Sequence, residues 1–150
     1  MNHKTHSRKG FTLVEILIVV IILGILAAIV IPQFTEASND ARESALASDL
    51  QTVRSQVELF KVQHKDSYPG EADGITFVEA LTQKTKIDGT ADASGAYGPY
   101  LQTFPTNPFN DLATVDVQAG ADGLGGGNHG WYYNTTTGKF SPDDDAHSAL

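Results

Sequence analysis

Residues 11–31 read FTLVEILIVVIILGILAAIVI, and in this run only Thr12 and Glu15 are polar. At about 1.5 Å per residue the run makes a helix of roughly 31 Å, enough to cross a hydrocarbon core of about 30 Å. A helix also satisfies every backbone polar group internally, as lipid requires. The run therefore predicts a membrane-spanning helix. Because an intramembrane charge is costly, Glu15 is predicted to be functional.

The charges on the two sides of this run predict its orientation. Lys4, Arg8 and Lys9 precede the run, and no acid lies among the first ten residues. Acids such as Glu36 and Asp40 follow the run. The positive-inside rule therefore places the N-terminus in the cytoplasm and the chain beyond the run on the far side of the membrane.

Two general kinds of apolar N-terminal segment can be compared with this run. A secretory signal peptide has an apolar region of about 7–15 residues followed by a small-residue cleavage site. The run is longer than that, and no such site follows Ile31. A plain single-pass anchor explains the length and the orientation, but it does not explain why Glu15 stands five residues after Gly10.

The residues RKG at 8–10 and FTLVE at 11–15 closely resemble the class III leader junction of type IV pilins and type II secretion pseudopilins. The resemblance extends to about Phe34. It implies that prepilin peptidase, a membrane-embedded aspartyl enzyme, cuts between Gly10 and Phe11 and then N-methylates Phe11. It also implies that Glu15 serves assembly by meeting the free amine of the first residue of an adjacent subunit.

Composition sets the broad class of the chain. The formal net charge is −8 and there is no cysteine. An acidic surface repels nucleic acid, so no nucleic-acid partner is expected. Many type IV pilins close a C-terminal loop with a disulfide, so the absence of cysteine favours the pseudopilin branch.

We expect a removable leader at 1–10, a transmembrane and filament-core helix at 11–31, and one periplasmic head at 32–150.

The helix is predicted to continue beyond the membrane segment. Pro32 removes a backbone donor and clashes with the carbonyl of Ala28, which predicts a kink. No Gly or Pro interrupts residues 33–68 afterwards, and apolar residues recur at helical spacing, so this part needs a sheet to pack on. The predicted stripe consists of Phe34, Ala37, Ala41, Ala45, Leu50, Val53, Val57 and Phe60. The helix is expected to end near Lys65.

The head is predicted to be of the α+β class. Thr76 and Glu79 fit a capping box that opens a second helix running to about Thr85. Loop composition follows over 86–109, and strand signals appear at 113–118, at 131–133 and from residue 139. We expect a small antiparallel sheet whose apolar face covers the helix stripe. A long N-terminal helix on such a sheet resembles the pilin-like fold.

Signals for catalysis are weak. The residues GGGNHG at 125–130 formally match GxGxxG, but Trp131 to Tyr133 predict a strand after them instead of the required helix. The histidines show no zinc spacing, and there is no nucleophile elbow or P-loop. Asn134 begins a formal glycosylation sequon, which we interpret as chance. We therefore expect a protein that is not an enzyme.

Acidic residues near the C-terminus are candidates for a calcium site, because calcium prefers oxygen ligands. The candidates are Asp122, Asp143, Asp144 and Asp145. Major pseudopilins commonly hold a structural calcium in a C-terminal loop. This chain does not reproduce the ligand spacing associated with that site, and a solvated acidic tail is the alternative.

The resemblance as a whole implies a structural subunit of a type II secretion pseudopilus, most like a major pseudopilin. Such a subunit waits as a single-pass inner-membrane protein with a periplasmic head, and it then joins a periplasmic filament that drives protein secretion. The implied partners are further copies of the chain, prepilin peptidase, the inner-membrane assembly platform, minor pseudopilins and membrane lipid. The alternatives are a type IV pilus major pilin and a signal-anchored periplasmic domain of unrelated function.

Overall fold

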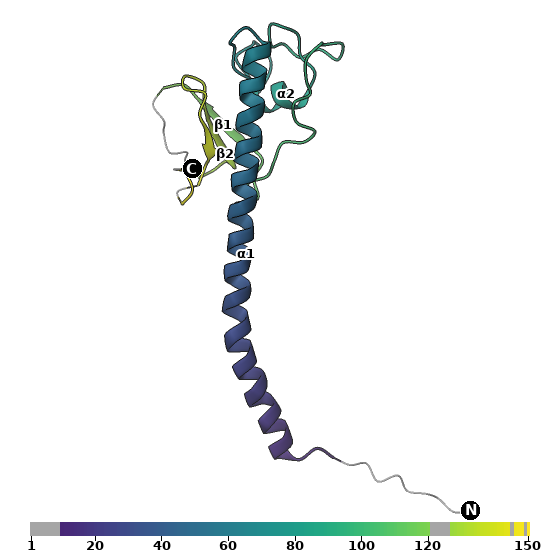
Figure 1. Cartoon of the computed structure of the whole chain (residues 1–150), viewed down its shortest axis with the longest axis vertical. Helices are drawn as coiled ribbons and strands as arrows, with labels where there is room; N and C mark the ends of the chain where they lie inside the picture. The colour runs from purple at the N-terminus through teal and green to yellow at the C-terminus, as the bar shows by residue number, and fades with distance from the viewer. Residues whose placement is uncertain (1–9, 121–126, 145, 149) are drawn as a thin grey trace, which may run out of the picture. The chain divides into compact units, whose positions relative to one another are not determined.

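The computed structural model describes residues 10–120, 127–144, 146–148 and 150. Its elements follow the chain in the order α1 (Leu13–Gln63), α2 (Phe77–Thr82), β1 (Val115–Gln118), β2 (Trp131–Asn134) and β3 (Phe140–Pro142). Figure 1 labels the first four of these elements. The chain divides into two units, Met1–Asp40 and Ala41–Leu150, and each is described by itself.

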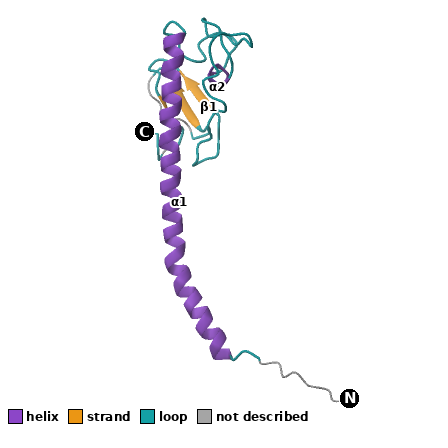
Figure 2. Ribbon diagram, turned by 45° about the vertical axis from the view of Figure 1, so that its right-hand side comes forward, coloured by secondary structure: helices purple, strands orange, loops and turns teal. Residues whose placement is uncertain are grey.

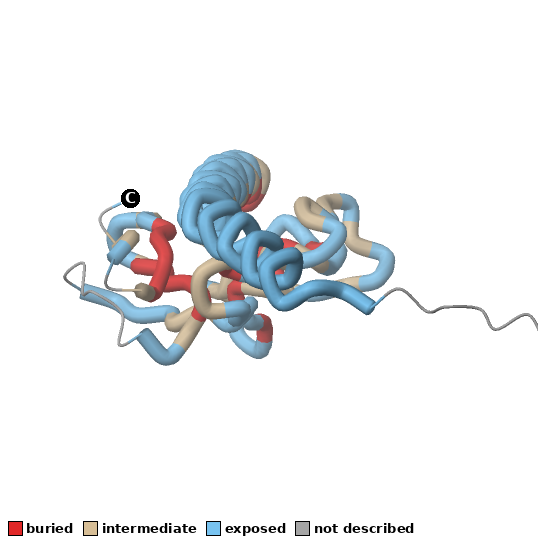
Figure 3. Tube along the Cα trace, turned by 90° about the horizontal axis from the view of Figure 1, so that it is seen from below, coloured by how far each residue is buried: buried red, intermediate tan, exposed pale blue. Residues whose placement is uncertain are grey.

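The described part of the first unit consists mainly of the first half of α1. The helix begins at Leu13 and continues through Pro32 without a break in its assignment, while the kink at Pro32 stays a prediction. Figure 3 colours nearly all of these residues as exposed. The large apolar side chains here therefore have no partner within their own unit.

In the second unit, the rest of α1 forms one wall of the hydrophobic core. Its fully buried side chains are Leu46, Leu50, Val53, Val57 and Phe60. The predicted stripe is thus confirmed from Leu50 onward, but Leu46 takes the place expected for Ala45. The expectation was wrong for Phe34, Ala37, Ala41 and Ala45, which are exposed, because the rest of the core packs on α1 only from Leu46 onward.

The second helix begins as its capping box predicts. The backbone N–H of Glu79 donates to the Thr76 hydroxyl (3.2 Å), and the backbone N–H of Thr76 donates to the Glu79 carboxylate (2.9 Å). Two of the unpaired donors at the helix start are satisfied in this way. The helix ends at Thr82, about a turn earlier than expected, because the backbone of Gln83 is extended.

The three strands form a mixed sheet in the order β1-β2-β3, drawn in orange in Figure 2. The β2 and β3 strands are antiparallel, with Tyr133 opposite Phe140, whereas β1 and β2 are parallel, with Val117 opposite Tyr133. The expected antiparallel pairing of β1 with β2 was therefore wrong. About a dozen residues connect these two strands, which is long enough for the crossover that parallel pairing needs.

The sheet packs on α2 through aromatic rings, has a further ring contact between its own strands, and shares one hydrophobic core with the buried side chains of α1. The ring centroids of Phe77 and Tyr133 lie 4.2 Å apart, and those of Trp131 and Phe140 lie 5.1 Å apart. Arg54 of α1 also donates two hydrogen bonds to the backbone carbonyl of Phe140, at 2.9 and 2.7 Å. These contacts hold the sheet on the helix stripe, as the α+β prediction requires.

Candidate processing and assembly site

The predicted cleavage junction lies outside the helix. Gly10 and Phe11 precede the first residue of α1, both are exposed, and 83% of the Phe11 surface is accessible. A Cβ added to Gly10 would meet no atom within 4 Å. The junction is therefore accessible, non-helical backbone, which is the form that a peptidase can bind.

Glu15 caps the start of its own helix. Its Oε2 accepts hydrogen bonds from the backbone N–H and the hydroxyl of Thr12, both at 2.8 Å, and the N–H of Glu15 donates to the Thr12 hydroxyl at 3.3 Å. This is the reciprocal pattern of a capping box. Our reading of the sequence missed it, although the spacing Thr-x-x-Glu at residues 12–15 is its usual signal.

The arrangement has a chemical consequence for processing. Cutting before Phe11 would create a free α-amine one residue from Thr12, and such an amine is largely protonated near neutral pH. The backbone N–H and the hydroxyl of Thr12 both donate to Oε2 of Glu15. A carboxylate at the first turn, next to a newly made cation, is suited to pairing with an amine.

The apolar surface of α1 lies directly beside this site. Every large apolar side chain from Leu13 to Ile31 is exposed in the isolated chain. Among the described residues, α1 is the one helix long and apolar enough to cross a membrane, as judged by length and composition. Such a surface needs lipid or other helices around it.

The acidic residues near the C-terminus are only partly described. Asp122 and Asp145 lie outside the described residues. Asp144 is bound to protein donors, with Oδ1 2.6 Å from Nδ1 of His147 and Oδ2 accepting from Asn107 at 3.3 Å. Within the described ranges, no group of three or more acidic, histidine or cysteine side chains is placed to hold a metal ion.

Asp143 differs from Asp144 because one of its oxygens has no hydrogen-bond partner in the part of the chain that the structure describes. The residue is completely buried, and its Oδ2 accepts from the backbone N–H of His129 at 2.9 Å. Its Oδ1 is also buried and has no hydrogen-bond partner among the described residues. An unpaired carboxylate oxygen is costly to bury, so this atom is suited to a cation or a proton donor.

Two polar side chains of the head core, His64 and Tyr100, have structural partners. His64 is buried, with Nδ1 2.8 Å from the Phe60 carbonyl and Nε2 2.9 Å from the Thr85 hydroxyl. Because a carbonyl only accepts, Nδ1 donates to Phe60. Burial raises the pKa of Tyr100 to about 12, and its hydroxyl donates to Gln63 at 2.6 Å. The position of His64, four residues after Phe60 on the stripe, was a sequence signal for this buried role.

Two weaker sequence motifs can also be placed. Gly127 to Gly130 lead directly into β2 and not into a helix, so the described part of the GxGxxG match lacks the context of a dinucleotide site. Residues 125 and 126 lie outside the described residues. Asn134 is completely buried, with its amide donating to the carbonyl of Gly120, which supports reading its sequon as chance.

The chain combines an exposed Gly-Phe junction, an apolar helix whose start is capped by an acid, and a small α+β head on the other half of that helix. This combination defines a prepilin-like protein. Residues 5–31 match the family described as "Prokaryotic N-terminal methylation motif", and residues 33–129 match "Type II secretion system (T2SS), protein G". The chain belongs to the type II secretion system protein G family.

Individual relatives agree with this assignment. The chain is 33% identical to "Type II secretion system core protein G" of Pseudomonas aeruginosa over 131 residues, which cover 81% of this chain and 89% of that protein. It is 31% identical to the protein of the same description from Vibrio cholerae over 134 residues, 83% of this chain and 88% of that protein. The comparison with solved structures found no match.

Proposed function

We propose that this chain is the structural subunit of a type II secretion pseudopilus, processed by prepilin peptidase and assembled into a periplasmic filament that drives protein secretion. The observation that carries the proposal is the accessible Gly10-Phe11 junction placed directly before an exposed, membrane-length apolar helix. The match of residues 33–129 to the protein G family supports the pseudopilus in preference to a type IV pilus.

Assembly is the work that this subunit performs, and Glu15 is the residue that sets its register. In the proposed filament, the Glu15 carboxylate pairs with the methylated amine of Phe11 on the adjacent copy. The pairing penalises wrong registers, because a charge left unpaired inside a bundle of apolar helices is unfavourable. Thr12 holds the carboxylate in the first turn of its own helix until a neighbouring amine arrives.

The proposed partners follow from this role. Before assembly the chain lies in the inner membrane as a single-pass protein, with its N-terminus in the cytoplasm and its head in the periplasm. Prepilin peptidase, the inner-membrane assembly platform, minor pseudopilins, lipid and further copies of the chain are its partners. We propose no catalytic activity, since the function lies in building a polymer.

Mass spectrometry of the N-terminus tests the proposal. We expect the mature chain to begin at Phe11 and to carry one methyl group on its amine. Replacing Gly10 with a bulky residue should leave uncut precursor in the membrane, whereas Gly10→Ala serves as the milder control. Filaments built from chains that still begin at Met1 would contradict the proposal.

A structural calcium ion in the head is a second, separate proposal. The buried, unpaired Oδ1 of Asp143 fits an oxygen ligand, whereas the Asp144 carboxylate is already bound by His147 and Asn107. Asp143 would hold the ion, and Asp122 and Asp145 are further candidates from the sequence. The ion would neutralise the buried carboxylate and stabilise the folded head by mass action.

A further inference from the structure

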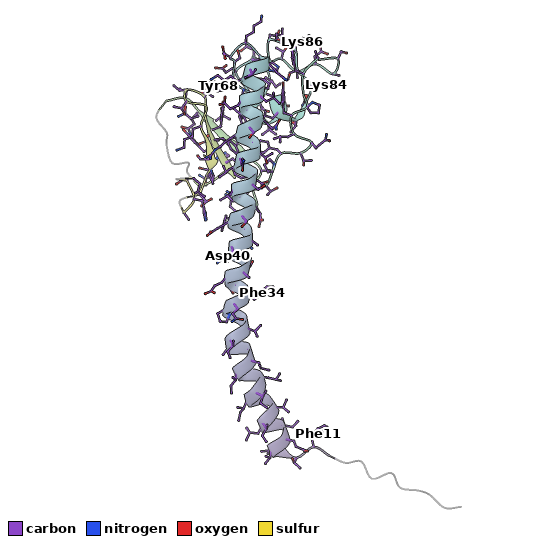
Figure 4. All side chains as sticks on the ribbon, in the orientation of Figure 1. Phe11, Phe34, Asp40, Tyr68, Lys84 and Lys86 are labelled. Atoms are coloured by element: carbon purple, nitrogen blue, oxygen red, sulfur yellow. The ribbon has the colours of Figure 1, made fainter. Side chains whose placement is uncertain are left out.

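Two asparagine side chains of one loop hold the chain just before β2. Asn107 is completely buried, and its Nδ2 donates to the carbonyl of Gly130 at 2.8 Å. Asn110 is partly buried, and its Nδ2 donates to the carbonyl of His129 at 2.8 Å. Figure 4 shows the side chains of the head gathered around the strands and the second half of α1. The carbonyls of two consecutive residues are therefore both bound by the same loop.

This loop is itself well fixed, because each asparagine also closes a local turn. The Oδ1 of Asn107 accepts from the N–H of Phe109 at 2.9 Å, and the Oδ1 of Asn110 accepts from the N–H of Leu112 at 3.1 Å. Such bonds to the backbone two residues further on are typical of Asx turns. A Cβ added to Gly130 would collide with the carbonyl of Leu112, so the loop lies directly against the chain before β2.

Asp143 is held by the two residues that the asparagines bind. Its Oδ2 accepts from the backbone N–H of His129 at 2.9 Å, and its own N–H donates to the carbonyl of Gly130 at 3.1 Å. The orientation of this completely buried carboxylate therefore depends on the loop behind these residues. Because Oδ2 is bound to protein, Oδ1, which no described residue binds, is the oxygen left for a cation.

Asn107 also binds the neighbouring acid. Its Nδ2 lies 3.3 Å from Oδ2 of Asp144, whose Oδ1 accepts from the backbone N–H of His147 at 3.0 Å. The His147 ring stacks on that of Phe109, with the ring centroids 4.0 Å apart. An asparagine amide has two N–H donors, so one can serve Gly130 and the other Asp144. Asp144 is thus bound by protein while Asp143 keeps one oxygen for an ion.

We propose that Asn107 is a positioning residue of the cation site in the head. It holds Asp143 through His129 and Gly130, and it keeps the Asp144 carboxylate bound to protein. The inference rests on the calcium ion proposed above and names the residue that orients the carboxylate ligand. Asn107 does not bind the ion itself, because its amide and its Oδ1 are already bonded to protein. Replacing a residue that orients a metal ligand typically lowers metal affinity by about 10–100-fold.

Calorimetric titration of the full-length chain in detergent with calcium chloride tests this role. Asn107→Ser replaces the amide and its two donors by one hydroxyl, and we expect calcium to bind at least about tenfold more weakly. The control is Thr76→Ala, which removes the cap of α2 and so destabilises the head without touching Asp143 or the loop around Asn107. It should lower the melting temperature and leave the calcium affinity unchanged. Trp131 fluorescence shows that each variant is folded at the temperature of the titration.

Hydrogen exchange, followed by mass spectrometry without calcium, measures the positioning separately from the ion. The backbone N–H of His129 should exchange several-fold faster in Asn107→Ser, because the segment that presents it to Asp143 is released. Thr76→Ala should not change the exchange of this N–H relative to that of the β2 strand. Asn110→Ser, which releases only the His129 carbonyl, should change both measurements in the same direction by less, and it serves as the test if Asn107→Ser does not fold.

The outcomes separate the positioning role from the proposed ion. Unchanged calcium affinity in folded Asn107→Ser, an equal loss in Thr76→Ala, or unchanged exchange at His129 would overturn the role of Asn107. If Asn107→Ser does not fold, unchanged values for Asn110→Ser would overturn it. A lack of calcium binding by the unmodified chain would instead refute the proposed ion, and the positioning role with it.

Discussion

Tyr133 offers a sharp test of the head's packing, because its hydroxyl is buried and has no hydrogen-bond partner within the described ranges of the chain. The side chain is fully buried on β2, and its ring lies 4.2 Å from that of Phe77. Burial also raises the pKa of this phenol above its ordinary value. The substitution Tyr133→Phe keeps the ring and removes only the unpaired group, so we predict that it stabilises the head.

The size of the effect follows from the cost of the unpaired hydroxyl. A buried polar group without a partner costs about 1–3 kcal/mol, and the small void left by the oxygen offsets part of the gain. We therefore expect the free energy of unfolding to rise by about 1 kcal/mol. For a domain of about 100 residues, this raises the melting temperature by roughly 4–8 °C.

The same chemical change at Tyr100 is the matched control, and its predicted sign is opposite. The Tyr100 hydroxyl donates to Gln63 at 2.6 Å, so Tyr100→Phe loses a hydrogen bond and leaves an acceptor unpaired. We expect a loss of about 0.5–1.5 kcal/mol. Trp131 is the single tryptophan and is fully buried, so its fluorescence reports melting of the head in the full-length chain held in detergent.

The two variants together decide whether the reasoning holds. A lower melting temperature for Tyr133→Phe would show that the hydroxyl has a partner in the folded head. Equal shifts of one sign in both variants would show that ring packing, and not hydrogen bonding, controls the response. Either result would refute the assignment of Tyr133 as an unpaired group.

Three further predictions address the processing site, the calcium proposal and the second helix. Glu15→Leu should insert in the membrane but fail to enter filaments, whereas Thr12→Ala, which removes only the cap, should still assemble; filament yield measures both. Added calcium should raise the melting temperature of the head, and Asp143→Ala should abolish that rise; an unchanged rise would exclude Asp143 as a ligand. Hydrogen bonds from Thr76 lower the pKa of Glu79 below its ordinary value of 4.5. The ionised Glu79 carboxylate should therefore stabilise the head fully above pH 4.5, and this stabilisation should be lost as the pH falls through the pKa of Glu79 in the folded state. In melting curves measured over a series of pH values, Glu79→Gln should reduce the fall in melting temperature at acid pH. An unchanged fall would contradict the role of Glu79.

The elements that the sequence predicted well depend on contacts between near neighbours. The long α1 helix follows from an apolar membrane-length run and, after Pro32, from a stretch without Gly or Pro, and the start of α2 follows from a capping box whose members are three residues apart. The cap formed by Thr12 and Glu15 belongs to the same kind and was readable from its spacing. Such features need no knowledge of the rest of the fold.

The features that the sequence did not predict depend on which distant surfaces meet. Helical spacing showed that α1 has an apolar stripe, but it did not show that the core begins at Leu46 and leaves Phe34 exposed. The strand signals located β1 and β2, but side chains alternate between the two faces of a strand in the same way in parallel and antiparallel pairs. The parallel choice appeared only when the register of Val117 with Tyr133 was known.

The functional surfaces divide in the same way. The sequence by itself determined the apolar span and the place of Glu15 in it, and it predicts the junction at Gly10 and Phe11, because these lie within one short segment whose chemistry is local. Only the tertiary structure decided that Asp143 is buried with one oxygen that no described residue binds, whereas Asp144 is bound by its neighbours. The burial and partners of a side chain in the head are set by residues tens of positions away, and these are brought together only when the sheet packs on α1.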